Sequence, residues 1–168
     1  YSANLEAQIE GPQGSAELAS DINGDLQSLT LSELRVSSGA GFLDGDVNIG
    51  FAGPLTWKAN LELTRFNPGY WAPELDASLN GALVSEGLLP SEGRPSMTAD
   101  WDLKGSWRTR DTRVQGKLNQ SGDTLVLSGL RLQIDENLLS GGGEWGPELA
   151  GELRLNLPAP QHFMPGLK

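Results

Sequence analysis

The chain has 168 residues, of which 38% are hydrophobic, with 22 Gly, 10 Pro, no Cys and a formal net charge of −10. Its length suits one domain of ordinary size with a substantial core, and the many turn-forming residues favour short β elements over helices. The acidic balance opposes binding along nucleic acid, and the absence of Cys excludes disulfides, thiol nucleophiles and thiolate metal sites.

No segment approaches the roughly 20 consecutive apolar residues that cross a bilayer as a helix. The chain starts at Tyr1 without the charged and apolar regions of a signal peptide. We therefore expect it to be a section of a longer protein that carries its targeting information elsewhere.

Apolar and polar residues alternate with period two along most of the chain, which predicts half-buried β-strands. The pattern is clearest at 55–63, where Leu55, Trp57, Leu61 and Leu63 alternate with polar residues. Turn signals between such segments predict an all-β antiparallel meander. The predicted strands lie at 3–9, 16–22, 29–36, 43–51, 55–63, 75–83, 97–107, 114–118, 125–132, 139–145 and 149–157.

An acidic turn joins the second and third predicted strands. The segment Asp21-Ile22-Asn23-Gly24-Asp25 resembles the first ligands of a calcium loop, but Leu26 stands where that loop needs Gly and Ser32 where it needs Glu. We interpret the segment as a turn held by hydrogen bonds from its Asp and Asn side chains.

The alternation slips by one residue at Ser32-Glu33 and again at Ser128-Gly129. A slip would turn the rest of a strand inside out unless a bulge absorbed the extra residue, and Gly129 suits that conformation. We predict a bulge at both places.

Two connections stand out between the predicted strands. In 68–75, Pro68 can open a single helical turn and Asn67 can cap it. The longest loop is expected at Glu86–Pro95.

About a dozen strands spaced about 4.8 Å apart would make a sheet on the order of 50 Å wide, which must curl or fold over its apolar face. If the opposed walls meet, the result is a filled sandwich or barrel. If they stay apart, the result is an open apolar gutter, and the pattern leaves both possibilities open.

The chain also repeats itself. A shift of 96 positions, the separation of Leu29 from Leu125, also aligns Val36 with Leu132 and Gly45 with Gly141. Nearly all matched positions are apolar, Gly or Pro, as in stacked repeat units. We predict two tandem repeats, 1–96 and a truncated 97–168, in one continuous β domain.

Candidate catalytic groups have simpler interpretations. Asp100 and Asp102 share a strand face with Lys104, which favours a solvated surface over a glycosidase pair. His162 is the single histidine, with no nucleophile elbow and no metal-ligand cluster around it. The basic residues Arg108, Arg110, Arg113 and Lys117 fit a solvated hairpin end. We expect no enzyme activity, metal or cofactor.

The five tryptophans raise the alternative of a carbohydrate-binding module. Four of them, Trp57, Trp101, Trp107 and Trp145, lie in the apolar phase of their strands, which favours core or groove lining. Trp71 sits instead at the corner near Tyr70, where it could cap a strand end or touch a membrane interface.

Two segments resemble recurring units of the TamB proteins within the wider AsmA-like group. The first is Phe66-Asn67-Pro68-Gly69-Tyr70-Trp71-Ala72-Pro73-Glu74-Leu75 with the following Ala77-Ser78-Leu79-Asn80-Gly81. The second runs from Leu132-Gln133-Ile134-Asp135-Glu136-Asn137 through Gly141-Gly142-Gly143 to the corner Phe163-Met164-Pro165-Gly166-Leu167. The likeness covers most of the chain.

This resemblance implies an open β-taco, or half-barrel, with an apolar interior. TamB proteins are anchored in the inner membrane of Gram-negative bacteria, cross the periplasm and reach an outer-membrane barrel partner, TamA. They are linked to outer-membrane protein insertion and to phospholipid transfer. The family brings no catalytic residues to this chain.

Our leading hypothesis is a conduit section whose apolar floor carries phospholipid acyl chains. The rival is an interaction scaffold with a filled interior whose sheet edges pair with strands of outer-membrane proteins. A carbohydrate-binding module ranks third. The predicted groove lining is Val47, Ile49, Leu55, Trp57, Leu61, Leu63, Leu79, Leu83, Trp101, Leu103, Leu127, Leu132, Leu153 and Leu155.

Overall fold

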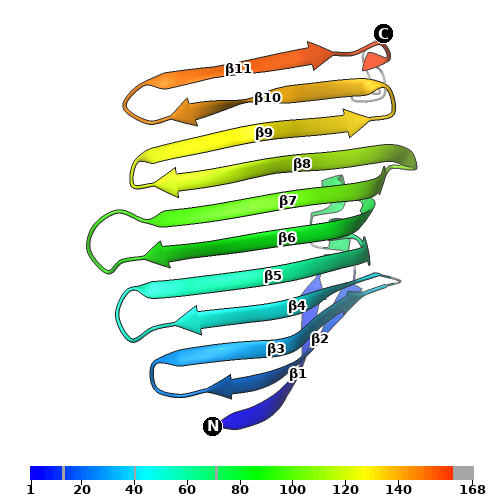
Figure 1. Cartoon of the computed structure of the whole chain (residues 1–168). Coiled ribbons are helices and arrows are strands. Elements are labelled where there is room, and N and C mark those ends of the chain that lie inside the picture. Colours follow the sequence, from blue (N-terminus) through cyan, green and yellow to red (C-terminus); the bar gives the residue numbers. More distant parts are fainter. Residues whose placement is uncertain (13, 40, 71, 161–168) are drawn as a thin grey trace.

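The computed structural model describes residues 1–12, 14–39, 41–70 and 72–160. These residues form one antiparallel sheet of eleven strands whose spatial order follows the sequence (Figure 1). The strands are β1 (Ser2–Gly11), β2 (Gly14–Gly24), β3 (Ser28–Ser38), β4 (Gly41–Gly50), β5 (Leu55–Phe66), β6 (Ala77–Leu89), β7 (Ser96–Trp107), β8 (Arg110–Ser121), β9 (Thr124–Ile134), β10 (Asn137–Trp145) and β11 (Leu149–Asn156). Strands β1 and β11 are the two edges, so the sheet is open. The predicted all-β antiparallel meander is confirmed.

The register of the sheet brings the apolar phase of every strand to one side. Leu61 on β5 lies opposite Gly45 on β4 and Leu83 on β6. Leu103 on β7 likewise lies opposite Gly81 on β6 and Val114 on β8. Because residues paired across strands point to the same face, these side chains share a surface that we call the inner face.

The two predicted bulges are present. Ser32 and Glu33 together oppose Asp46 between the pairs Leu31 with Val47 and Leu34 with Gly45. Ser128 and Gly129 oppose Gly142 in the same way. The extra residue at each place keeps the following leucine on the inner face.

Unusual backbone conformations also recur along the chain. Three pairs of residues separated by 96 positions adopt positive φ, a conformation that L-residues seldom occupy. The pairs are Glu33 and Gly129 (51° and 60°), Gly39 and Asp135 (58° and 51°), and Gly45 and Gly141 (153° each). These unusual φ values therefore recur after 96 positions, while the division into two tandem repeats stays a prediction.

The β5–β6 connection forms two short 3₁₀ helices, η1 (Pro68–Tyr70) and η2 (Pro73–Leu75). Asn67 supports them, because its Oδ1 accepts hydrogen bonds from the Gly69 N–H (2.8 Å) and the Ala77 N–H (3.1 Å). The predicted helical turn and its Asn67 cap are both found, although as 3₁₀ geometry.

The expected long loop at Glu86–Pro95 is wrong in extent. β6 continues to Leu89, and residues 90–95 alone connect it to β7. Gly87 lies within β6, where it pairs with Trp57 and Met97 and leaves room for the Trp57 ring. Among the described residues the longest connection is 67–76.

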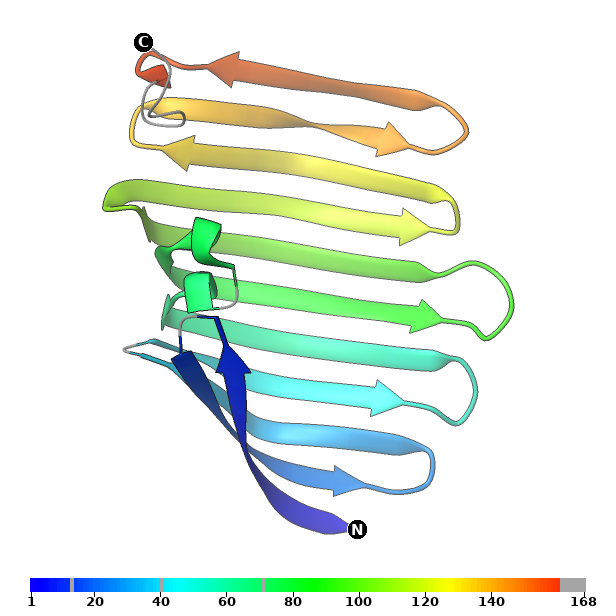
Figure 2. The ribbon, with the colours of Figure 1, turned by 180° about the vertical axis from the view of Figure 1, so that it is seen from behind.

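The sheet curls toward its inner face. In Figure 2, which views the sheet from that side, the far ends of β1 and β2 rise in front of it and approach η1 and η2. Tyr70 of η1 lies against Gly39, where an added Cβ would overlap its hydroxyl group, and near Gly14. The 3₁₀ segment and the β1–β2 hairpin thus meet over one end of the inner face.

The inner face is left open along most of its length. The accessible surface is 10384 Å², whereas a compact monomer of 17.9 kDa would expose about 8,000 Å². Leu34, Leu63 and Ile134 are among the few buried apolar residues, and Leu153 and Leu155 on β11 are each 63% exposed. The fold is an open half-barrel.

Candidate functional site

The register places every predicted lining residue on the inner face. Val47 and Ile49 pair with Ala59 and Trp57 across β4 and β5. The remaining ones follow through paired positions across the sheet, which are Leu55 with Leu89, Leu61 with Leu83, Leu63 with Gly81, Leu79 with Gly105, Trp101 with Leu83, Leu103 with Val114, Leu127 with Leu118, Leu132 with Leu139, Leu153 with Gly141, and Leu155 with Leu139. Contact of these residues with a ligand remains a prediction.

Ser20 and Ser85 on the inner face form hydrogen bonds within the protein. The Ser20 hydroxyl donates to the Ser32 carbonyl (3.0 Å). Ser85 accepts from the Trp57 indole N–H (3.2 Å) and donates to the Thr98 carbonyl (3.1 Å). Because these hydroxyl groups already form hydrogen bonds within the protein, they need no hydrogen-bond partner from a molecule in the groove.

Charged side chains of the strands gather on the opposite, outer face. There Arg113 pairs with Asp102 (3.0 Å), and Lys117 pairs with Asp100. Both carboxylates are about half exposed, as predicted for a solvated surface. Within the described strands, the register puts a single charged residue, Arg110, on the inner face, at the very end of β8.

Two tryptophans lie across glycines of adjacent strands and smooth the inner face. A Cβ added at Gly87 would overlap the Trp57 ring, and one added at Gly116 would lie 2.5 Å from Cζ2 of Trp101. Each indole therefore covers the backbone of its neighbour, which gives a flat apolar floor.

One end of the inner face carries a roofed pocket. The 3₁₀ segment covers a cavity of about 300 Å³ whose lining includes Leu75, Leu79, Trp107, Val114, Leu132 and Ile134. The Trp107 indole N–H donates to the Glu74 carbonyl (3.3 Å), which ties the sheet to η2. We call this space the corner pocket.

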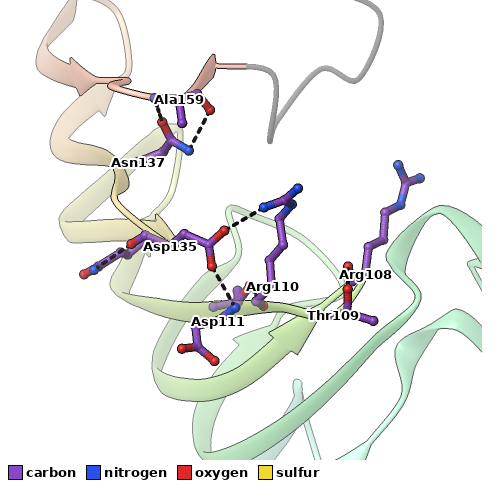
Figure 3. A network of polar contacts seen from close by, with 9 residues as sticks. Arg108, Thr109, Arg110, Asp111, Asp135, Asn137 and Ala159 are labelled. Carbon is purple, nitrogen blue, oxygen red and sulfur yellow. Dashed lines mark hydrogen bonds and ion pairs between the residues drawn. The ribbon is translucent and has the colours of Figure 1, made fainter.

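A polar network lies at the same end of the sheet (Figure 3). Arg110 forms an ion pair with Asp135 (2.8 Å), whose second oxygen accepts from the Asp111 N–H (3.1 Å). Asn137 is fully buried and makes two reciprocal hydrogen bonds of 2.9 Å with the backbone of Ala159. The Asn137 bonds fasten the start of β10 to the segment that follows β11.

Sequence reasoning missed this network. One feature of the sequence could have pointed to Asn137, because its amide side chain stands in the apolar phase of β10, two residues before Leu139. Arg108 lies in the β7–β8 hairpin turn, as predicted, and its guanidinium lies 4.8 Å from the centre of the Trp107 ring, a contact that the sequence pattern did not indicate.

The acidic turn is built as expected. Asp25 Oδ1 accepts hydrogen bonds from the backbone N–H groups of Gln27 (2.7 Å) and Ser28 (2.8 Å). These bonds stabilise the carboxylate and lower the pKa of Asp25 below its ordinary value of 3.8.

A search of the described part of the chain finds no group of three or more His, Cys, Asp or Glu side chains placed to hold a metal ion. The same residues contain no helix long and apolar enough to span a membrane. His162 and Trp71 lie outside the described residues.

The comparison with known proteins decides the family. Residues 1–168 match the family described as TamB, N-terminal domain. The chain belongs to the TamB family. One curated relative is the "Translocation and assembly module subunit TamB" of Haemophilus influenzae, which is 26% identical over 164 residues, and the aligned region covers 94% of this chain and 12% of that protein. No solved structure matches this TamB-family chain.

Proposed function

We propose that this chain is a non-enzymatic section of a conduit that carries phospholipid between the inner and outer membranes and supports the assembly of outer-membrane barrel proteins. The observation that carries the proposal is the inner face, whose apolar phase is continuous from β1 to β11. Acyl chains can bind along such a floor because the burial of each CH₂ group contributes about 0.8 kcal/mol.

Charge placement supports the same function. One unpaired charge in an apolar channel would cost several kcal/mol and act as a barrier. The cross-strand ion pairs of Asp100 and Asp102 lie on the outer face, and Arg110 stands at the end of its strand beside Asp135. The middle of the groove stays free of such a barrier.

The cellular setting of the proposal follows the family. The curated relative is named as a subunit of a translocation and assembly module, and this chain matches 12% of its length. We place the chain in the periplasm of a Gram-negative bacterium, within a protein anchored in the inner membrane. Contact with an outer-membrane barrel such as TamA would then come from other parts of that protein.

The rival function is a scaffold that adds strands of outer-membrane proteins to its sheet edges. Edge strand β11 favours it, because it pairs only with β10 among the described strands and its other edge can accept a strand. A scaffold with a filled interior would, however, expose less surface than the 10384 Å² found.

Photocrosslinking separates the two functions. A photoreactive residue in place of Leu61 on the inner face should crosslink phospholipid in the full-length protein, whereas one in place of its neighbour Glu62 on the outer face should not. Mass spectrometry of the purified protein identifies the lipid. Crosslinks at neither position, or equally at both, would reject the conduit, and crosslinks confined to β11 and a barrel protein would favour the scaffold.

A further inference from the structure

The corner pocket has a cationic rim. Its wall includes the Trp107 ring, and the Arg108 guanidinium lies 4.8 Å from the centre of that ring. The hydrogen bond from the Trp107 indole to Glu74 fixes the plane on which Arg108 rests. A positive charge therefore stands at the edge of an apolar cavity.

Arg108 keeps its charge available. Arg110 next to it is neutralised by Asp135, but Arg108 forms no ion pair with any carboxylate in the described residues. Figure 3 shows Arg108 and Arg110 extending to the same side of the strand end, while the Asp111 carboxylate points away from both. A ligand at this rim would meet an unpaired guanidinium.

The backbone that carries Arg108 is strained. Arg108 and Thr109 form the β7–β8 turn with φ of 48° and 69°, and Thr is β-branched, a residue type that rarely adopts positive φ. Strain of this kind gathers at functional positions. The strained turn holds Arg108 on the Trp107 ring.

We propose that Arg108 binds the phosphodiester of a phospholipid whose acyl chain lies in the corner pocket. Guanidinium groups form charge-assisted, often bidentate hydrogen bonds to phosphate oxygens, and they retain this capacity when stacked on an aromatic ring. The inference rests on the proposed conduit and adds a headgroup site to it. Lipid bound here lies with its headgroup at the rim formed by the β7–β8 turn.

The test uses the full-length protein with p-benzoylphenylalanine at Val114, a lining residue of the pocket. The probes are dihexanoyl phosphatidylglycerol, dihexanoyl glycerol with the same chains but no phosphate, and inorganic phosphate as competitor. Mass spectrometry quantifies the crosslinked product at each probe concentration. The variants are Arg108→Gln, Arg108→Lys and the control Lys104→Gln, which removes a cation from the outer-face phase of β7.

The expected result is an increase of about tenfold in the half-maximal concentration of dihexanoyl phosphatidylglycerol for Arg108→Gln, the loss typical of a charged hydrogen bond. Arg108→Lys should recover part of it, while Lys104→Gln and the diacylglycerol curves should stay unchanged. Equal effects of Arg108→Gln and Lys104→Gln would overturn the headgroup site. Displacement by inorganic phosphate at the same concentration would also overturn it, by assigning the site to a free anion.

Other outcomes separate this inference from the conduit itself. If dihexanoyl glycerol and dihexanoyl phosphatidylglycerol crosslink equally in the parent protein, acyl binding stands and the Arg108 site is wrong. If Val114 crosslinks only to the protein's own chain, the pocket is filled from within and the Arg108 site is wrong. If neither lipid crosslinks at Val114 nor at Leu61, the proposed function fails as well.

Discussion

The Trp57 ring lies across Gly87 on the adjacent strand, so closely that a Cβ at Gly87 would overlap it. The indole N–H also donates to Ser85 two residues away (3.2 Å), which holds the ring flat along β6. Gly87 therefore leaves the space that the largest side chain of β5 occupies.

Gly87→Ala should lower the free energy of unfolding by about 1 to 3 kcal/mol, because the added methyl group displaces the Trp57 ring. Urea denaturation followed by tryptophan fluorescence measures the change. The matched control is Gly53→Ala in the exposed β4–β5 turn, where an added Cβ would have no neighbour within 4 Å. If both variants lost the same stability, the ring would not be seated on Gly87.

The two bulges allow a reciprocal exchange. Glu33 has φ of 51° where its repeat partner is Gly129 at 60°. The left-handed conformation costs a non-glycine residue about 1 to 2 kcal/mol, and the greater freedom of unfolded Gly offsets part of that. Glu33→Gly should stabilise the protein by about 0.5 kcal/mol, and Gly129→Glu should destabilise it by at least as much. Thermal unfolding of both variants tests the pair, and matching signs would contradict it.

Asn137→Ala should strongly destabilise the protein, although it changes only one buried side chain. It would leave the Ala159 N–H and carbonyl without their partners in a buried place, at about 1 to 3 kcal/mol for each unsatisfied group. Asn119→Ala on the outer face of β8 is the control. Hydrogen exchange at the Ala159 amide should speed up in the first variant alone, and unchanged exchange there would show that Asn137 does not hold this segment.

Charge on the inner face should block function without unfolding the sheet. In the full-length parent, Leu61→Arg or Leu79→Glu should abolish its activity in outer-membrane assembly, because the charge lies in the apolar path. Glu62→Arg, one residue away on the outer face, should have no effect. Circular dichroism and expression level report folding. A folded Leu61→Arg protein with normal activity would reject the conduit.

Asp25 gives a prediction for acidic pH. Because hydrogen bonds from Gln27 and Ser28 lower its folded-state pKa, its contribution to stability is present above the ordinary value of 3.8 and is lost as the pH falls through the lower folded value. Asp25→Asn keeps an acceptor oxygen and removes the titration, so stability should fall less steeply with acid below pH 3.8. An NMR titration midpoint of Asp25 at or above 3.8 would rule this out.

Much of the sheet could be predicted from local pattern alone. Alternation identified all the strands and the face on which Leu61, Leu103 and Leu153 lie, because side chains in a strand point to opposite sides with period two. The slips at Glu33 and Gly129 marked the bulges by the same rule. Loop length was less predictable, because Gly87 serves a strand when a tryptophan of the neighbouring strand covers it.

The sequence by itself determined which residues share the apolar face and that this face repeats after 96 positions. Only the tertiary structure decided that the face stays open, that η1 and η2 roof a pocket at one end, and that Arg108 rests on Trp107 at its rim. The reason is physical. Alternation depends on neighbours two residues apart. The curl of the sheet, the cover over the corner pocket and its rim depend instead on contacts such as Tyr70 with Gly39 and Trp107 with Glu74, which join segments about 30 residues apart. Such contacts leave no periodic pattern in the sequence.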